Sequence, residues 1–374
     1  MNASLRNMEF CSFVTKRPIQ ILLPVLWCLI IASCSSEKME PNDAYVCQTR
    51  PIQNNYHRNQ LLESFDESIL EGIASIDVPD SSGAMGRNKN GYFHVRFQMG
   101  ISAQTDLAVY NDDIQALEYA IKSIEYAFQY QLPQGDFLLV VPTELEGQVP
   151  GKADLASGVA FFLSSLGLAL NDFDQSLWYH SAALIAYKYR IEALRPNIEN
   201  AAMWLLTQRS TLENADANAP NRLFFDALAF YSLGKWLGND ELKSAGLSFA
   251  GLAMAKKHPN GYFLEGDGWD SSYQGVGVNV GFNLYTLLVD SEPLKPILWD
   301  CLSCAVNWQQ SRVLSNGEIS TAGNTRVFPG GEDFLGVEKE VDWIDTMTGF
   351  FMMGYLSNDD SYITAAHEVM NYYY

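Results

Sequence analysis

Residues 221–257 read NRLFFDALAFYSLGKWLGNDELKSAGLSFAGLAMAKK. The residues that end one helix and begin the next in this segment indicate how the chain folds. A run of helix-forming residues ends at Gly238, a residue type that suits the left-handed conformation closing many helices. Asn239 follows directly and is a favoured N-cap for a second helix. So short a connection makes consecutive helices antiparallel neighbours. The segment therefore predicts a helical hairpin.

Similar segments lie on both sides of this hairpin. Apolar residues recur in them at helical spacing, and Pro, Gly and Asn residues separate them. The predicted helices span residues 57–76, 111–131, 152–170, 174–194, 196–208, 221–237, 239–257, 272–288, 293–313, 342–356 and 359–373. Residues 91–99 alternate and are predicted to form a strand or an extended loop, and residues 316–328 are predicted to form a β-hairpin. The chain is thus predicted to be all-α with short β-hairpin insertions.

The first 33 residues have the pattern of a secretion signal. Lys16 and Arg17 precede an apolar run over residues 19–31 that is too short for a comfortable membrane span. Small residues then lead into Cys34, and this arrangement resembles the lipoprotein box of bacterial envelope proteins. The resemblance implies a signal peptide at residues 1–33, a lipid on Cys34 that anchors the chain to the outer membrane or cell surface, and a tether at residues 34–56. An uncleaved membrane anchor is the alternative.

Composition narrows the classes of function. The net charge of −20 argues against binding to nucleic acid, and a polyanionic substrate would need a local basic pocket. Cys47 falls in the tether, where its thiol could be free. Cys301 and Cys304 share one face of a predicted helix and are expected in the core rather than in a redox or metal site. No metal-binding or nucleotide-binding motif occurs in the sequence, so we predict neither a metal nor a cofactor.

Acidic and aromatic residues concentrate at residues 260–277, NGYFLEGDGWDSSYQGVG, just before the predicted helix 272–288. Asp270 can cap this helix, which leaves Tyr273 in its first turn and facing inward. A hydrolase needs one protonated and one ionised carboxyl group. Glu265 or Asp267 could supply one of them, and Glu332, Asp333 or Asp154 the other. Capping and turn formation are the structural alternative for these acids.

The segment GWDSSYQ at residues 268–274 resembles the D-G-S-Y/F stretch of toroid polysaccharide lyases, with Ser271 in place of the glycine. The series of helical hairpins over residues 61–374 likewise resembles the six-hairpin (α/α) toroid of polysaccharide lyases and glycoside hydrolases. The resemblance implies a complete or incomplete toroid over residues 57–374 that binds a polysaccharide or oligosaccharide. Trp269, Asp270 and Gln274 would line its substrate groove.

A lyase acting on a uronate chain needs a cation for the carboxylate and a base for the neighbouring proton. Arg326 is the predicted cation, with Asn324 beside it; an ion pair with Glu332 or Glu338 is the alternative. Tyr273 is the predicted acid or base, and His180 or His258 its partner, although a core position is the alternative for His180. The leading hypothesis is a lyase acting by β-elimination. A hydrolase using paired carboxylates, and a non-catalytic protein that binds a glycan or another protein, remain the alternatives.

Overall fold

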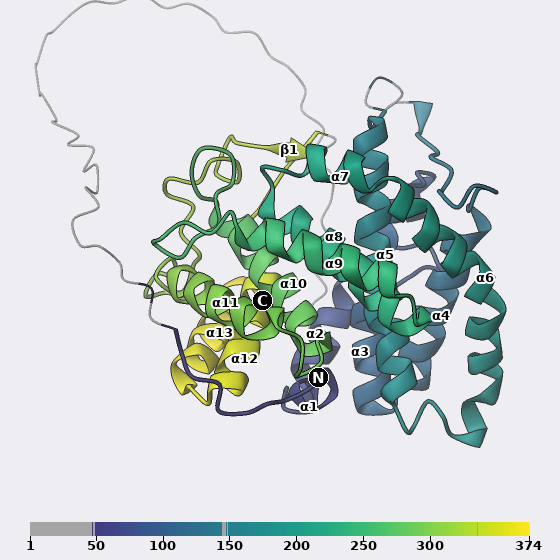
Figure 1. Cartoon of the computed structure of the whole chain (residues 1–374), viewed down its shortest axis with the longest axis horizontal. Coiled ribbons are helices and arrows are strands. Elements are labelled where there is room, and N and C mark those ends of the chain that lie inside the picture. The colour runs from purple at the N-terminus through teal and green to yellow at the C-terminus, as the bar shows by residue number, and fades with distance from the viewer. Residues whose placement is uncertain (1–46, 48, 144–146, 148, 335) are drawn as a thin grey trace, which may run out of the picture. The chain divides into compact units, whose positions relative to one another are not determined.

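The computed structural model describes residues 47, 49–143, 147, 149–334 and 336–374 (Figure 1). The predicted signal peptide, the predicted lipid attachment at Cys34 and most of the predicted tether lie outside these residues. Contacts separate the chain into Met1–Asp43 and Ala44–Tyr374, and all the described helices and strands belong to the second unit.

Thirteen α-helices make up most of the described residues, which confirms the all-α prediction. They are α1 (Arg58–Leu62), α2 (Glu67–Ile76), α3 (Ile101–Asn111), α4 (Ile114–Gln129), α5 (Lys152–Gln175), α6 (Ile185–Thr207), α7 (Arg209–Ala215), α8 (Pro220–Leu237), α9 (Asp240–Met254), α10 (Ser271–Leu287), α11 (Leu294–Gln310), α12 (Trp343–Ser357) and α13 (Asp360–Tyr373). Short 3-10 helices occur at η1 (Gly86–Asn90), η2 (Val95–Gln98) and η4 (Ala182–Leu184). The strands β1 (Asp333–Phe334) and β2 (Val337–Glu338) pair antiparallel.

The predicted hairpin at residues 221–257 is confirmed as α8 and α9, which lie side by side in Figure 1. Gly238 ends α8 at a φ of 69°, in the left-handed region where glycine carries no steric penalty. The side chain of Asn239 then accepts hydrogen bonds from the first backbone N–H groups of α9. Helices α12 and α13 are joined in the same way, with Asn358 as the left-handed residue.

Five such hairpins form two concentric layers. The first helices of the hairpins contact one another in the order α3, α5, α8, α10 and α12, and α4, α6, α9 and α11 contact one another outside them. Helix α1 touches α3, α5, α10 and α12, and α2 packs on α3, so the N-terminal helices occupy the place of a sixth hairpin. The domain is therefore an incomplete (α/α) toroid, as predicted, and the first helices of the hairpins form its inner layer.

Glycines allow the inner helices to approach closely. A side chain at Gly167 in α5 would clash with Ser232 of α8, and one at Gly275 in α10 would clash with Thr346 of α12. Helix α5 is also long and apolar enough to cross a membrane, but 83% of the relevant window is buried in this core. Its apolar length reflects its position among other helices.

Several predicted element boundaries are wrong. Residues 57–76 form two helices rather than one, and the predicted strand at 91–99 contains η2 and a single bridge between Phe93 and Val140. Residues 185–194 of the helix predicted at 174–194 and the helix predicted at 196–208 form one helix, α6, with Pro196 inside it, whereas residues 177–184 form turns and η4. Residues 316–328 contain turns and take part in two isolated bridges, Val313 to Ile319 and Trp269 to Asn324. The paired strands lie further on, in β1 and β2.

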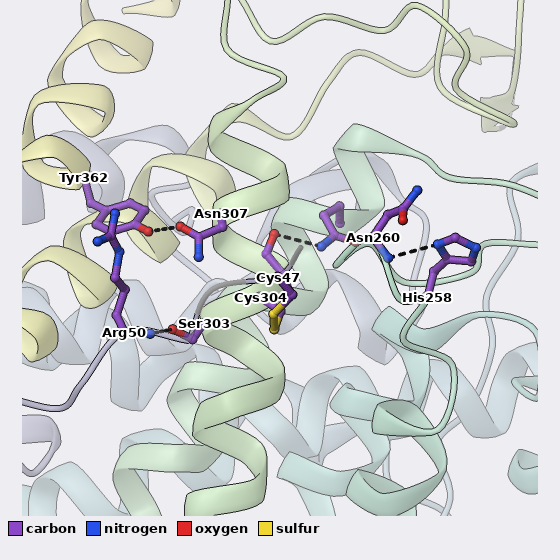
Figure 2. Close-up of a disulfide and its surroundings, with 10 residues drawn as sticks. Cys47, Arg50, His258, Asn260, Ser303, Cys304, Asn307 and Tyr362 are labelled. Atoms are coloured by element: carbon purple, nitrogen blue, oxygen red, sulfur yellow. Dashed lines mark hydrogen bonds between the residues drawn. A yellow bond between two sulfur atoms is a disulfide. The ribbon is translucent and has the colours of Figure 1, made fainter. Parts of the chain in front are cut away.

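A disulfide joins Cys47 to Cys304 of α11, across 257 residues of sequence (Figure 2). Cys47 is therefore not free, and Cys304 is more than a core residue. Next to the disulfide, Arg50 donates its backbone N–H to Ser303 Oγ at 2.8 Å, and its carbonyl accepts from Trp299 Nε1 at 2.7 Å. Cys301, one helical turn away, is buried with a free thiol, as expected for a core cysteine.

Candidate functional site

The start of α10 organises the candidate site. One carboxylate oxygen of Asp270 accepts hydrogen bonds from the N–H groups of Ser272 and Tyr273, which confirms the predicted cap. Its other oxygen accepts from the N–H groups of Arg326 and Val327, at 3.0 and 2.8 Å. Asp270 is 1% exposed and its oxygens are occupied, so it does not line a groove. It instead fixes the α10 start against the segment that carries Arg326.

Tyr273 lies at the centre of a charged group that we call the Tyr273 cluster: Tyr273, Glu265, Arg326, Glu332 and Lys339. The Tyr273 hydroxyl donates to Glu332 Oε2 at 2.9 Å and accepts a short hydrogen bond from Lys339 Nζ. The Arg326 guanidinium lies 4.5 Å from the centre of the Tyr273 ring. The segment at residues 260–277 and the segment that carries Arg326 are therefore in contact, although Tyr273 and Arg326 lie some fifty residues apart in sequence.

Arg326 is held between two carboxylates. It donates through Nη1 to Glu265 at 2.5 Å and through Nη2 to Glu332 at 2.9 Å, while Lys339 Nζ donates to Glu332 at 2.7 Å. The ion-pair alternative for Arg326 is thus what the structure contains. Because its donors are engaged inside the cluster, Arg326 orders Glu332 and Tyr273.

The surroundings shift the pKa values of the residues in the Tyr273 cluster in different directions. Burial raises the pKa of Glu265 to about 6 despite its bond to Arg326. Burial also acts to raise the pKa of Glu332, but hydrogen bonds from Lys339 and Arg326 outweigh it and lower that pKa to about 2. Burial raises the pKa of the Tyr273 phenol and lowers that of the Lys339 ammonium. Tyr273 therefore keeps its proton at neutral pH, and Lys339 gives one up more easily than an exposed lysine.

A cavity of about 380 Å³, which we call the basic cavity, adjoins the cluster through Glu332 and Lys339. Its position follows from the inner helices, because the first turn of α5, the first turn of α8 and η2 before α3 all contribute to it. Its lining residues are Tyr92, His94, Arg96, Val149, Pro150, Gly151, Asp154, Arg222, Glu332 and Lys339. Three cations therefore face two carboxylates in one cavity, in a chain of strongly negative net charge.

The arginines of the basic cavity are held by the scaffold. Arg96 lies 4.5 Å over the Phe161 ring, and burial together with the charge of Arg222 lowers its pKa to about 10, so it remains a cation at neutral pH. Arg222 reaches Asp216 at 3.3 Å and Asp154 at 3.8 Å, with 26% of its side chain exposed. Because Asp216 is fully buried, it holds the Arg222 guanidinium from the protein interior.

His94 is the histidine of this cavity. Its Nδ1 accepts from the N–H of Arg96, and burial lowers its pKa to about 4, so the ring is neutral at neutral pH with its proton on Nε2. The sequence pattern did not predict four residues of this cavity: His94, Arg96, Arg222 and Lys339. Arg96 and His94 lie in the segment that was taken for a strand, and no local pattern around Arg222 or Lys339 marks a site.

The two histidines that were predicted as partners of Tyr273 lie elsewhere. His180 is exposed beyond the end of α5, bonded to the carbonyl of Asp174. The start of α5 lines the basic cavity, and the helix has 24 residues, so His180 lies about 36 Å away along it. His258 stacks on Tyr262 at 4.4 Å and accepts from the Asn260 N–H, close to the disulfide in Figure 2.

Other predicted binding residues have structural roles. Trp269 packs edge-on against Tyr262 and Trp308 rather than presenting an open face. Gln274 is buried between the Phe263 N–H and the Ala305 carbonyl. Asn324 is buried and bonds to Ser271 and to the Val327 carbonyl, so it holds the loop in place.

The predicted acids divide between the cluster and the surface. Asp267 is exposed at the tip of the turn from Glu265 to Gly268 and does not join the cluster. Glu265 and Glu332 do join it, and Asp154 reaches the basic cavity. No group of three metal-binding side chains occurs among the described residues.

Comparison with known proteins gives only distant likeness. No protein-family model and no curated protein matches the chain. A structure described as a UGL variant with dGlcA-Glc-Rha-Glc shares 13% identity at a TM-score of 0.49, covering 82% of this chain and 90% of that one. The unsaturated glucuronyl hydrolase of Bacillus sp. GL1, described as responsible for glycosaminoglycan degradation, shares 12% at 0.48, covering 82% and 90%. A D-mannose isomerase shares 11% at 0.46, covering 84% and 85%. We draw no activity from likeness this low, and the toroid rests on the helix contacts given above.

Proposed function

We propose that the chain cleaves a uronate-containing polysaccharide by β-elimination, with the reacting sugar in the basic cavity. The observation that carries this proposal is the position of the Tyr273–Lys339–Glu332 contact at the edge of a cavity that also presents Arg96 and Arg222. Guanidinium groups bind carboxylates with two parallel hydrogen bonds, which suits a uronate. The cavity supplies the local positive charge that a chain of net charge −20 needs to hold a polyanion.

The reaction requires one base and one acid. Arg222 and Arg96 bind the uronate carboxylate and make the proton on the adjacent carbon more acidic. The fraction of Lys339 that has lost its own proton acts as the base and removes the proton from that carbon, and the electron pair forms a carbon–carbon double bond as the bond to the glycosidic oxygen breaks. Tyr273 donates its proton to that oxygen. The Lys339 ammonium then returns a proton to the Tyr273 phenolate through their hydrogen bond, which restores the starting state.

A hydrolase is the second candidate, and one observation favours it. Glu265 and Glu332 bind the same guanidinium, yet their pKa values are about 6 and about 2. A carboxyl pair whose proton affinities are driven apart is the arrangement that glycosidases use, one acid protonated and the other ionised. Glu265 is 4% exposed, however, whereas Glu332 faces the basic cavity. A substrate in the cavity would contact Lys339, the base of the proposed lyase, but not Glu265, the acid of the hydrolase. We therefore prefer the lyase.

The test is to incubate the purified protein with a panel of uronate polysaccharides and record two signals. Ultraviolet absorbance reports the new double bond of a lyase product, and a reducing-sugar assay reports any cleavage. We expect both signals to rise together. Reducing ends without absorbance would establish the hydrolase instead. Binding without either signal would make the chain a glycan-binding protein and overturn both enzyme proposals.

We further propose that the chain works in the bacterial envelope, attached through a lipid on Cys34. The sequence pattern of residues 1–34 is one support. The disulfide between Cys47 and Cys304 is a second, since disulfides persist in oxidising compartments outside the cytosol. An enzyme anchored there would meet polysaccharides outside the cytoplasm.

A further inference from the structure

A second cavity, of about 340 Å³, lies between the N-terminal helices α1–α3 and the inner helices α10 and α12. We call it the acidic cavity. One wall is apolar and includes Leu62, Phe65 and Met99. The lining also includes Asp342 and Asp345, from the start of α12. The proposed reaction uses none of these residues.

The acidic cavity has one cation in its lining, and that cation is neutralised by other groups. Arg58 is 2% exposed, and it donates to Asp106 at 2.6 Å, to Asp172 at 2.9 Å and to Asn283. Two carboxylates already balance the Arg58 charge. The carboxyl groups of Asp342 and Asp345 therefore have no lysine or arginine partner among the lining residues.

Asp342 and Asp345 are close neighbours. The N–H of Asp345 donates to Asp342 Oδ1 at 3.2 Å, and Asn279 Nδ2 of α10 donates to Asp345 Oδ1 at 2.5 Å. Burial raises the pKa of both carboxyls, and the charge of Asp342 raises that of Asp345 further. Adjacent carboxylates in a partly buried site are stabilised by a cation that binds between or beside them.

We propose that the acidic cavity binds a protonated primary amine carried on a saccharide, with the ammonium at Asp345 and Asp342 and the sugar ring against Phe65 and Leu62. A bulky hydrated metal ion would not use the apolar wall, whereas a sugar ring presents C–H groups to it. The volume lies in the range of small-molecule pockets. The saccharide part of the inference rests on the proposed function; the amine part rests on the cavity alone.

The acidic and basic cavities are neighbours along the chain at two places. Lys339 lines the basic cavity and Asp342, three residues later, lines the acidic one. Likewise, Arg96 lines the basic cavity and Met99, three residues later at the end of η2, lines the acidic one. Three residues span at most about 11 Å, so these paired lining residues lie no further apart than that. A saccharide that carries a carboxylate on one unit and a free amine on another would offer one group to each cavity.

The test is calorimetric titration of the purified protein with D-glucosamine and with N-acetyl-D-glucosamine, in which an acetyl group replaces the charge on nitrogen. A charge-assisted hydrogen bond predicts about tenfold or more tighter binding of glucosamine. Asp345→Asn should remove that preference. Asp240→Asn, which deletes an exposed carboxylate on α9, should keep it. Ala103→Lys, which adds a competing ammonium to the same cavity, should abolish glucosamine binding and guards against a folding defect in the first variant.

Two outcomes would overturn the inference: equal affinity for the two sugars, or an Asp345→Asn variant that binds like the unaltered protein. These failures are distinct from failure of the proposed function. Glucosamine preference without cleavage of any polysaccharide would remove only the lyase. Cleavage without glucosamine preference would remove only the amine site.

Discussion

Tyr273 can be tested by deleting one oxygen. Tyr273→Phe keeps the ring under Arg326 and removes the proton donor, so we expect kcat to fall by about two to four orders of magnitude, the usual contribution of general acid–base catalysis. The melting temperature should change little by comparison. The measurement is the rate of absorbance increase on the best uronate substrate. A rate within a few-fold of the unaltered protein would remove Tyr273 from the reaction.

Glu265 leads to a prediction about pH and stability. Its pKa is raised from 4.5 to about 6 in the folded protein, so the folded state binds the proton more tightly than the unfolded state. The stabilisation from this proton is present in full below about pH 4.5 and is lost as pH rises through about 6, and it amounts to about 2 kcal/mol. Glu265→Gln cannot titrate. We expect the free energy of unfolding of the parent minus that of the variant to decrease by this amount between about pH 4 and about pH 7.

Urea unfolding at several pH values measures this difference directly. Glu332→Gln provides a contrast, because the pKa of Glu332 is lowered and its stabilisation is lost as pH falls towards about 2. A parent-minus-Glu265→Gln difference that stays flat, or grows, from acid to neutral pH would contradict the assigned environment of Glu265.

The sequence predicted some of these residues and not others, for identifiable reasons. Tyr273 and the Asp270 cap follow from the local pattern at a helix start. Arg96 and Arg222 acquire their significance only when η2 and the start of α8 converge, which no local spacing encodes. His180 was misplaced because the apolar positions around it suggested a helix where the structure has turns and η4.

At the scale of secondary-structure elements, the disulfide fastens the segment before α1 to α11. Cys47→Ser frees that segment, and closing a long loop by a disulfide typically contributes about 2–4 kcal/mol. We expect the thermal midpoint to fall by several degrees. Cys301→Ala alters the neighbouring buried thiol and leaves the disulfide intact, so it should lower the midpoint less. Equal midpoints for Cys47→Ser and the unaltered protein would mean that the bond does not fasten this segment.

Helix ends were predictable where a residue type enforces them. Gly238 and Asn239 fixed the turn between α8 and α9, and Asp270 fixed the start of α10. Pro196 misled the prediction, because a proline that suits a first helical turn stands inside α6 instead. Tertiary contacts around α6, with α4, α5 and α8, overrode the local preference.

At the scale of the whole molecule, the proposed lipid on Cys34 determines where the chain works. Cys34→Ser removes the acylation site while the domain from residue 57 onward keeps its sequence. We expect the unaltered chain to partition into the detergent phase and to incorporate labelled fatty acid, and the variant to do neither. Cys47→Ser serves as the control for loss of a cysteine and should still be labelled. Fatty acid labelling of the Cys34→Ser variant would contradict the anchor.

The toroid was predictable from the succession of hairpins, but the sequence left open whether it is complete. Residues 57–76 have helical periodicity, and only the structure shows α1 and α2 filling the place of a sixth hairpin. The basic cavity could not be predicted either, because the net charge of −20 does not reveal that three cationic residues line one cavity. Opposite charges in neighbouring cavities emerge only from the packed domain.

The central claim is that the basic cavity holds the carboxylate of a uronate through Arg222 and Arg96. The most direct measurement is calorimetric binding of a uronate oligosaccharide and of its carboxyl-reduced counterpart to the protein and to Arg222→Gln. We predict that reducing the carboxyl groups weakens binding to the protein by about tenfold to a hundredfold, and that Arg222→Gln loses most of this difference. Equal binding of both oligosaccharides to the unaltered protein, or an undiminished preference in Arg222→Gln, would contradict the account.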